Sequence, residues 1–466
     1  MKTEASIHHP IHSCEESSRQ RSVHVITFGC QMNQHDSEMI GGLLEDAGYI
    51  LTEHLEAADV ILFNTCCVRE HAEQRLYGRV SQLKALKAKK PELIVGVGGC
   101  VAQKEKAALT KRFSHVDLVF GTNALGGIAD LLRRVENGER PVVSTPDVCA
   151  SPEHRPPITL GRARISAWVS VMRGCDNYCS YCVVPYVRGP QRSRRPDEVV
   201  AEVRALAEGG VVEVTLLGQN VNSYGRDLHV DASFARLLEQ LDAVVGITRI
   251  RFTTSHPKDI STDLMRAIRD LPKVCEHVHL PVQAGSTRIL ELMNRGYSSE
   301  EYLRIVERLR DLIPHISLTT DIIVGFPGET EEDFEQTRLM LEKVRFDGAY
   351  IFKYSSRSGT AAGSLDNRVD KSTIAARHRA LLEFQKEVSL ERLKSLLNTT
   401  QSVLAESHDA KRHGFLVGRT RGHRVARFCG GQEDIGREIE IRVCRLDGWT
   451  LVGEAAQHSS GQEPQG

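Results

Sequence analysis

The chain has 466 residues, and its 60 Lys and Arg residues against 61 Asp and Glu residues give a formal net charge of −1. This balance excludes a globally basic nucleic-acid binder but not a local basic face, because net charge does not describe how charge is distributed. No stretch has the roughly 18 uninterrupted apolar residues of a membrane helix, and the polar N-terminus lacks the apolar core of a secretory signal. We therefore expect a cytoplasmic protein of roughly three domains, at about 150 residues each.

The first folded block is predicted over residues 22–145, after a disordered tail at residues 1–21. The β-branched runs HVITF, DVILFN, ELIVGVGG and VDLVFGTN alternate with helical patterns such as DSEMIGGLLEDAG. This alternation predicts parallel βαβ units in an α/β fold with an open, doubly wound sheet. Residues 146–163, rich in Pro and polar residues, are predicted to be a linker.

A second α/β block is predicted over residues 164–392. Its six strand-like runs are ISAWVSVM, VEVTLLG, RIRFTTS, HVHLPV, SLTTDIIVGF and GAYIFKYS, with helical patterns between them. Six strands are too few for an eight-stranded barrel, so an incomplete (β/α)6 barrel is expected. Functional sites of such folds lie at the carboxyl ends of the strands. The segments RGC, GQN, TSHPKD, QAGS and GFPGET follow the first five strands and mark that end.

The third block, residues 395–458, has five short strand-like runs separated by turn residues and is followed by a tail at residues 459–466. This pattern predicts a small five-stranded β-barrel of the OB type. Residues 411–445 contain nine Lys and Arg against four Asp and Glu, a local charge of +5.

Twelve cysteines in a reducing compartment need a role other than disulfide formation. Cys175, Cys179 and Cys182 form a CxxxCxxC motif in the loop after the first strand of the second block. A structural zinc site normally has four protein ligands, whereas three neighbouring thiolates suit a 4Fe-4S cluster that keeps one iron without a protein ligand. A zinc site or unrelated thiols are the alternatives, and the position of the motif at the expected functional end disfavours both.

A second set of cysteines follows strands of the first block. Cys30, Cys66 and Cys100 each come after a predicted parallel strand, so their loops can converge on one crevice. We predict a second cluster with three protein ligands there; ordinary core cysteines are the alternative. Cys66 is predicted to be the ligand and Cys67 a packing residue without a ligand role, because neighbouring side chains on an extended segment point apart. No metal role is expected for the remaining cysteines, which are Cys14, Cys149, Cys275, Cys429 and Cys444.

The CxxxCxxC motif, with Tyr181 just before its last cysteine, resembles that of the radical S-adenosylmethionine (SAM) superfamily. There the open iron binds SAM, and an electron from the cluster cleaves it to a 5′-deoxyadenosyl radical. Nine ordered segments that together span most of residues 22–392 resemble those of the methylthiotransferases, and the small third barrel resembles their RNA-binding TRAM domain. The segments that carry the resemblance include GCQMNQHDSE, NTCCVREHAE, GCVAQ, RGCDNYCSYCVVPYVRGPQRSR, VTLLGQNVNSYG, SHPKD, HLPVQAGS, LMNRGY and TTDIIVGFPGET.

Three segments, GCQMN, LLGQNVNSYG and MNRGYSSEEY, are most similar to the branch that acts on N(6)-dimethylallyladenosine beside the anticodon of tRNA. The resemblance implies methylthiolation at C2 of that adenine, two 4Fe-4S clusters, two uses of SAM, a reducing electron donor and a sulfur source. The second cluster of the family matches Cys30, Cys66 and Cys100. Sibling branches act on threonylcarbamoyl-adenosine in tRNA or on a ribosomal-protein aspartate, and an RNA-binding iron–sulfur sensor is the non-enzymatic alternative. A monomer is expected.

Further site residues are predicted from their place at the mouth of the barrel. Contacts with SAM or the base are predicted for Tyr181, Gly218, Gln219, Asn220, Gln283, Asp321 and Gly325. The arginines after the cysteine motif, Arg188, Arg192, Arg194 and Arg195, fit a solvated face or RNA phosphate contacts equally well. In the third block, backbone charge and stacking on Phe415 and Phe428 are expected to dock tRNA. The family resemblance implies a Pro where this chain has Ser358, and because Pro fixes φ, a looser loop is expected there.

Overall fold

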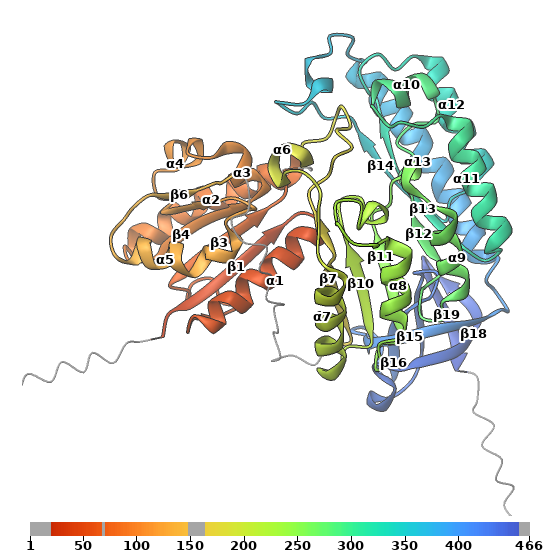
Figure 1. Cartoon of the computed structure of the whole chain (residues 1–466), viewed down its shortest axis with the longest axis horizontal. Coiled ribbons are helices and arrows are strands. Elements are labelled where there is room, and N and C mark those ends of the chain that lie inside the picture. Colours follow the sequence, from red (N-terminus) through yellow and green to blue (C-terminus); the bar gives the residue numbers. More distant parts are fainter. Residues whose placement is uncertain (1–19, 68–69, 148–163, 456–466) are drawn as a thin grey trace, which may run out of the picture.

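The computed structural model describes residues 20–67, 70–147 and 164–455. Three folded blocks follow one another along the chain (Figure 1). The predicted tails, most of the predicted linker, Cys14 and Cys149 lie outside the described residues. Within the described part of the chain, no helix is both long and apolar enough to cross a membrane.

The first block is a six-stranded parallel sheet with the strand order β2-β1-β3-β4-β5-β6. One apolar core lies between the sheet and α2, α3 and α4, and a second lies between the sheet and α1 and α5, which confirms the doubly wound prediction. The elements are β1 Ser22–Phe28, α1 Gln31–Asp46, β2 Ile50–Leu51, β3 Val60–Thr65, α2 Glu70–Lys89, β4 Ile94–Gly99, α3 Cys100–Glu105, α4 Ala108–Arg112, β5 Leu118–Phe120, α5 Ile128–Glu136 and β6 Val142–Ser144. The sequence patterns missed only the short edge strands β2 and β6.

The second block contains the six predicted strands, which are arranged as two parallel three-stranded sheets, β7-β10-β11 and β12-β13-β14. A bridge between Ile250 and Val274 links the two halves, and one large apolar core fills the space between the strands and their helices. The incomplete barrel is therefore confirmed. The strands are β7 Ser166–Ser170, β10 Glu213–Leu217, β11 Arg249–Thr253, β12 His277–His279, β13 Ser317–Val324 and β14 Gly348–Lys353.

Helices follow these strands, and polar residues fix where several of them begin. Ser298 and Glu301 form a capping box at the start of α11, and Thr330 of the GFPGET segment caps α12 together with Asp333. The small hairpin of this block consists of β8 Met172–Arg173 and β9 Arg192–Ser193. Its α-helices are α6 Val184–Arg188, α7 Pro196–Glu208, α8 Phe234–Asp242, α9 Thr262–Asp270, α10 Thr287–Leu292, α11 Ser299–Leu312, α12 Glu331–Val344 and α13 Lys371–Lys394.

The third block is a closed five-stranded barrel in the order β15-β16-β17-β19-β18, as predicted. Alternation along β17 turns Phe428 into the barrel core, where it is completely buried. The prediction of Phe428 as a base-stacking platform is therefore wrong, whereas Phe415 remains partly exposed. The strands are β15 Thr400–His408, β16 Phe415–Thr420, β17 Val425–Cys429, β18 Glu438–Asp447 and β19 Thr450–Ala455.

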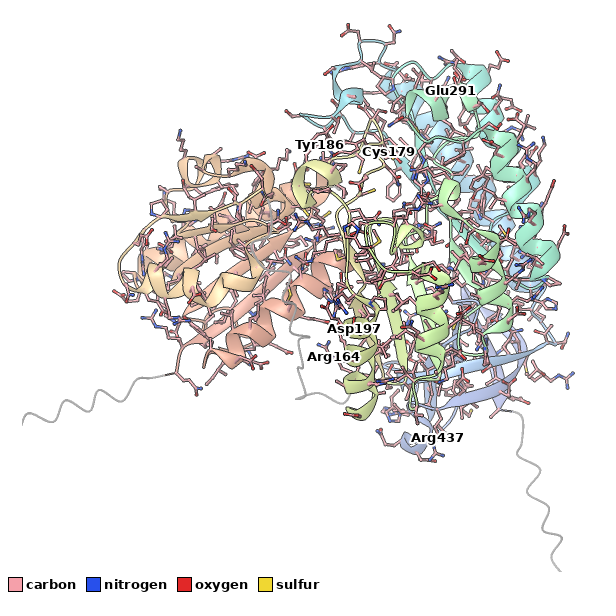
Figure 2. All side chains as sticks on the ribbon, viewed as in Figure 1. Arg164, Cys179, Tyr186, Asp197, Glu291 and Arg437 are labelled. Carbon is pink, nitrogen blue, oxygen red and sulfur yellow. The ribbon has the colours of Figure 1, made fainter. Side chains whose placement is uncertain are left out.

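The small barrel packs on the amino-terminal ends of the second-block strands. Arg249, the first residue of β11, is fully buried and pairs with Glu438 while donating to the backbone oxygens of Ser402 and Arg419. Arg251 similarly donates to the carbonyl of Thr420, at 2.8 Å. The cysteine motif lies at the opposite, carboxyl-terminal end, as the places of Cys179 and Arg437 show (Figure 2).

Candidate functional site

The CxxxCxxC loop is fixed at the carboxyl end of the second block by bonds to the end of α10. Ser180 donates its backbone N–H to the carbonyl of Met293 at 3.0 Å and its hydroxyl to that of Leu292 at 2.7 Å. The Asn294 amide donates to the carbonyl of Tyr178 at 3.0 Å. Cys175 and Cys179 are buried, and Cys182 is half-buried. The protein thus holds three thiols of one loop in place from a second, distant segment.

The environment of this loop disfavours thiolates when no cation is present. Burial and the neighbouring Cys179 raise the pKa of Cys182 to about 12, and burial raises the pKa of Cys175. A positively charged iron–sulfur core binds thiolate rather than thiol, so it would offset the cost of ionising these two cysteines. The donor set therefore fits the predicted cluster.

Arg295 is a site residue that the sequence prediction missed. Its guanidinium is buried and donates to the Sγ of Cys179 and to the Tyr181 hydroxyl, both at 3.4 Å. It also donates to the carbonyl of Pro281 at 2.9 Å, which fixes its orientation. The LMNRGY segment contained this residue, but no local pattern indicated that its arginine would reach a cysteine more than 100 positions earlier.

Four buried polar atoms at the ends of β10 and β11 have no hydrogen-bond partner within the described residues. They are Oε1 of Gln219, Oδ1 of Asn220, Oγ of Ser255 and Nε2 of His256. Leaving a buried polar group unpaired costs about 1–3 kcal/mol, so this end of the barrel is suited to a polar ligand. Burial, together with the charges of Arg295 and Lys258, lowers the pKa of His256 to about 2, so its ring is neutral near pH 7.

Gln219 and Asn220 were predicted, whereas Ser255 and His256 were missed although the SHPKD segment containing them was recognised. Two other predicted residues, Gln283 and Asp321, lie on the second half of the barrel. Gln283 is buried with a left-handed φ of 73°, and Asp321 on β13 lies 3.4 Å from the His279 ring.

The two predicted glycines of the barrel mouth pack closely against protein side chains. A Cβ on Gly218 would lie 2.8 Å from Met172, and one on Gly325 would lie 2.4 Å from Ile374 of α13. Their lack of a side chain is thus explained by packing, and contact of their backbone with SAM stays a prediction.

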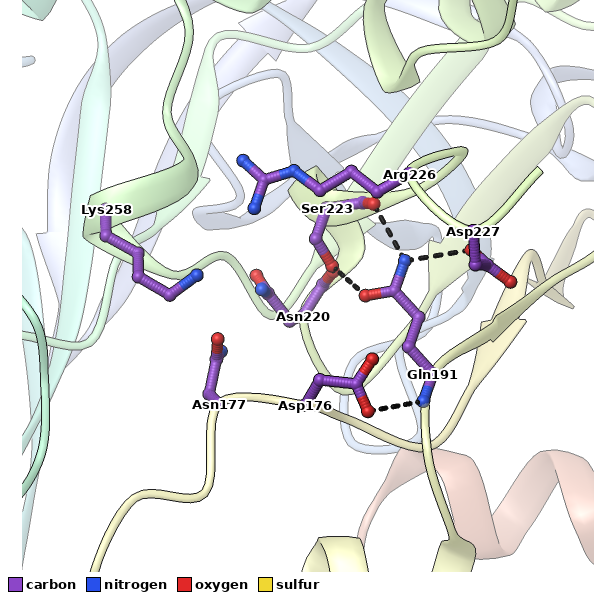
Figure 3. A pocket seen from close by; sticks show the side chains of 8 residues that line it. All are labelled: Asp176, Asn177, Gln191, Asn220, Ser223, Arg226, Asp227 and Lys258. Atoms are coloured by element: carbon purple, nitrogen blue, oxygen red, sulfur yellow. Dashed lines mark hydrogen bonds between the residues drawn. The ribbon is translucent and has the colours of Figure 1, made fainter. Parts of the chain in front are cut away.

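A polar pocket adjoins the cysteine loop (Figure 3). Its wall is organised by Gln191, which exchanges side-chain bonds with Ser223 and Asp227 and donates its backbone N–H to Asp176 at 3.0 Å. The remaining lining residues are Asn177, Asn220, Arg226 and Lys258. Asp176 and Asn177 lie between the first two cysteines of the motif, so the pocket opens directly beside the predicted cluster.

The second set of cysteines follows three adjacent strands. Cys30 comes after β1, Cys66 after β3 and Cys100 after β4, and these strands are neighbours in the sheet. Glycines make the close approach of the loops possible. A Cβ on Gly29, which has a φ of +140°, would lie 2.3 Å from the Cβ of Cys66, and Gly99 has a φ of +88° and a similarly close neighbour in Asn64.

The thiol of Cys66 lies between the other two and forms hydrogen bonds with both Cys30 and Cys100. The bond with Cys66 and the charge of Arg188 lower the pKa of Cys30 to about 6. Cys67 was predicted to point away from the set. Its thiol instead forms a hydrogen bond with Cys100. Cys66 remains the one that joins all three loops.

Neither set of cysteines, as the structure describes it, forms a binding site for a single metal ion. Among the residues that the structure describes, no three His, Cys, Asp or Glu side chains converge closely enough to hold a metal ion. A 4Fe-4S cluster takes one thiolate on each of three irons, so its ligands need not converge on one point. What the fold supplies beforehand is the choice of donors: three thiols in each of two places.

The arginines after the cysteine motif divide into two groups. Arg188 is buried and pairs with Asp36, and Arg194 pairs with Glu202 inside the protein, so neither lies on a solvated face or contacts RNA as predicted. Arg192 and Arg195 are exposed.

Comparison with known proteins gives two matching family models. Residues 169–341 match the radical SAM superfamily, and residues 22–121 match a family described as uncharacterized protein family UPF0004. The barrel and its cysteine loop thus define a radical SAM protein, a class that holds a 4Fe-4S cluster and SAM.

Two curated proteins, from Thermoanaerobacter pseudethanolicus and Caldicellulosiruptor saccharolyticus, are each named tRNA-2-methylthio-N(6)-dimethylallyladenosine synthase. Each is 48% identical to this chain, covering 95% and 94% of it and 94% and 93% of their own lengths. The chain belongs to the family of tRNA-2-methylthio-N(6)-dimethylallyladenosine synthases. The solved radical SAM methyltransferase TsrM from Kitasatospora setae has a TM-score of 0.53 at 14% identity, over 74% of this chain and 75% of that one, which shows a shared fold.

Proposed function

We propose that this protein methylthiolates C2 of N(6)-dimethylallyladenosine beside the anticodon in tRNA. The observation that carries the proposal is the identity of 48% over 95% of the chain to a curated synthase of that name. The placement of two separate three-cysteine sets in one chain supports it, because the reaction needs both a radical source and a sulfur-holding site. A C2–H bond of adenine is not acidic, so a general base cannot remove its hydrogen.

In this proposal Cys175, Cys179 and Cys182 hold the radical SAM cluster, and Cys30, Cys66 and Cys100 hold a second 4Fe-4S cluster. When bound, the first cluster supplies the electron that cleaves SAM. Arg295 orients Cys179 and Tyr181 through its two bonds at 3.4 Å. The unpaired atoms at the ends of β10 and β11 are placed to accept a polar ligand, for which SAM and the target base are the candidates.

The predicted SAM contacts of Tyr181, Gly218, Gln219, Gln283, Asp321 and Gly325 belong to the same proposal. Their common support is position: Tyr181 is on the cysteine loop, Gly218, Gln219, Gln283 and Gly325 follow strands, and Asp321 lies within β13, where its carbonyl accepts from the backbone N–H of Gln283. Cytoplasmic tRNA, a reducing electron donor and a sulfur source are the partners that the proposed chemistry requires, and a monomer is the proposed working form.

Nucleoside analysis of tRNA from a deletion strain tests the proposal. We expect N(6)-dimethylallyladenosine to accumulate and its 2-methylthio derivative to disappear, with restoration by the intact gene. Loss of a methylthio group from threonylcarbamoyl-adenosine instead, or from a ribosomal-protein aspartate, would identify a sibling activity. An iron–sulfur sensor would leave all three unchanged, and the reduced protein would release no 5′-deoxyadenosine from SAM.

A further inference from the structure

Two tyrosine rings are exposed at the edge of the cysteine motif. Tyr178 directly precedes Cys179, and Tyr186 lies on α6, four residues after Cys182. The two residues are 50% and 61% exposed, and their ring centroids lie 6.2 Å apart at an interplanar angle of 76°. They therefore meet edge to face, one of the preferred arrangements of aromatic pairs. Single exposed aromatic residues are common on protein surfaces, but burial does not explain a contacting pair beside a predicted cluster.

The backbone at Tyr178 is held in an unusual conformation. Its φ of 46° lies in the left-handed region, which non-glycine residues rarely adopt because of steric crowding. The side-chain amide of Asn294, in the segment after α10, donates to the carbonyls of Asn177 and Tyr178 at 3.3 and 3.0 Å. A distant segment thus stabilises the strained backbone that presents the Tyr178 ring to solvent.

The packing of α6 turns Tyr186 outward. Val183 and Val187, which are about one helical turn apart, are buried in the apolar core of the first block. The Thr122 hydroxyl donates to the carbonyl of Val187 at 2.5 Å. These contacts fix one side of α6 and leave Tyr186 exposed, at the same end of the second block as Cys179 (Figure 2).

The third tyrosine of this region has a different environment. Tyr181 packs against the core of the second block, and its hydroxyl accepts from Arg295 at 3.4 Å. It therefore belongs to the interior side of the loop, where contacts with SAM are predicted. Tyr178 and Tyr186 are on the solvent side, where a larger partner can reach them.

We propose that Tyr178 and Tyr186 form a stacking platform for an unpaired base next to the target nucleotide in the tRNA anticodon loop. The inference rests on the proposed function, because it takes tRNA as the substrate. An edge-to-face pair leaves ring faces open, and unpaired RNA bases are recognised by stacking on such faces. Arg192, four residues beyond the end of α6, is exposed and is placed to contact a phosphate of the same strand.

The test uses the full chain, reconstituted anaerobically with iron and sulfide, and a synthetic anticodon stem-loop that carries N(6)-dimethylallyladenosine. Its affinity is measured by fluorescence anisotropy at several salt concentrations. Tyr178→Ala and Tyr186→Ala should each weaken binding by about 5- to 100-fold, the range for loss of one stacked base. The salt dependence should stay the same, because no phosphate contact is removed. Tyr178→Phe and Tyr186→Phe keep the rings and should bind nearly as the wild type does.

An abasic nucleotide on either side of the target identifies the stacked base. At the stacked position it should weaken binding to the wild type but cost little further in Tyr186→Ala, because both changes remove the same contact. Additive losses at both positions would overturn the proposal. Val245→Ala, which truncates a 90% exposed side chain in the loop before β11, is the control and should bind as the wild type does.

Tyr178 adjoins Cys179, so iron content is measured for each variant, and Tyr186→Ala decides alone if Tyr178→Ala loses its cluster. Unchanged affinity in Tyr186→Ala overturns the platform. If SAM cleavage driven by a protein electron donor fell instead, the pair would be a docking site for that donor rather than for RNA. A wild-type protein that binds the stem-loop no more tightly than a duplex of equal length would refute the proposed function, and the platform with it.

Discussion

The two three-cysteine sites are built in opposite ways. In the second block the three thiols lie within eight residues of one loop, whereas in the first block they span 70 positions and come together only because β1, β3 and β4 are adjacent strands. A contiguous motif keeps its ligands close in any fold, but a dispersed set depends on the strand order of the whole sheet. The CxxxCxxC site is therefore a local feature of the sequence, whereas the site of Cys30, Cys66 and Cys100 is a product of the sheet topology.

Their electrostatics differ as well. At the motif, burial raises the pKa of Cys175 and Cys182, and one guanidinium, that of Arg295, reaches a sulfur. In the sheet, the bond with Cys66 and then Arg188 lower the pKa of Cys30 to about 6. Hydrogen bonds to Cys66 lower the pKa of both Cys30 and Cys100 in the sheet, whereas burial raises the pKa of Cys175 and Cys182 at the motif.

The largest expected effect sharpens the functional side of this contrast. Changing Cys175, Cys179 and Cys182 to Ala should halve the iron of the reconstituted protein, from about eight to about four, and abolish SAM cleavage. The measurements are iron content and 5′-deoxyadenosine after reduction. Cys275→Ala, a buried cysteine remote from both sites, is the control and should change neither. Continued formation of 5′-deoxyadenosine in the triple variant would show that the radical centre has been misassigned.

The converse variant should separate the two sites. Changing Cys30, Cys66 and Cys100 to Ala should also halve the iron, but SAM cleavage should survive while the methylthio product is lost, because the radical source uses a different donor set. Chromatography of 5′-deoxyadenosine and of the tRNA nucleosides measures both. If SAM cleavage disappeared together with product, the two sites could not be independent, and the comparison would fail.

The third block offers a test that should leave both sites intact. Of its nine basic residues over 411–445, five form ion pairs within the protein, so the predicted +5 is not all available to RNA. Arg437, Arg442 and Arg445 are exposed. Changing these three to Gln should weaken tRNA binding and reduce its salt dependence by about 0.7–0.9 in slope for each lost phosphate contact.

The matched control is Arg412→Gln, whose side chain is already paired with Asp447 at 3.0 Å. Tryptophan fluorescence or filter binding at several salt concentrations gives the slopes, and equal slopes would move the docking role to Arg192 and Arg195. Substitution is preferable to removing the block before Gln401. Truncation would take away the partners of Arg249 and uncover the strand ends on which the barrel packs.

The smallest expected effect concerns Cys67. Its thiol forms a hydrogen bond with Cys100, whereas the thiol of Cys66 forms hydrogen bonds with both Cys30 and Cys100. Cys67→Ala should therefore leave the iron content close to normal, with Cys66→Ala as the matched variant that loses a cluster. If Cys67→Ala lost a cluster and Cys66→Ala did not, Cys67 rather than Cys66 would be the ligand of the second site.

The sequence by itself determined the elements and the contiguous site. β-Branched runs gave the main strands of all three blocks, because a buried parallel strand has to be apolar on both faces, and spacing alone identified Cys175, Cys179 and Cys182. It also placed Cys30, Cys66 and Cys100 at strand ends, where parallel topology brings loops together.

Only the tertiary structure decided which polar residues lie inside. Arg188 and Arg249 look like surface residues in the sequence, and both are buried because a partner far away in the chain, Asp36 or Glu438, compensates them. Phe428 is in a core rather than at an RNA surface because the barrel closes around it. Such outcomes depend on contacts between distant segments, and no local pattern of residues encodes them.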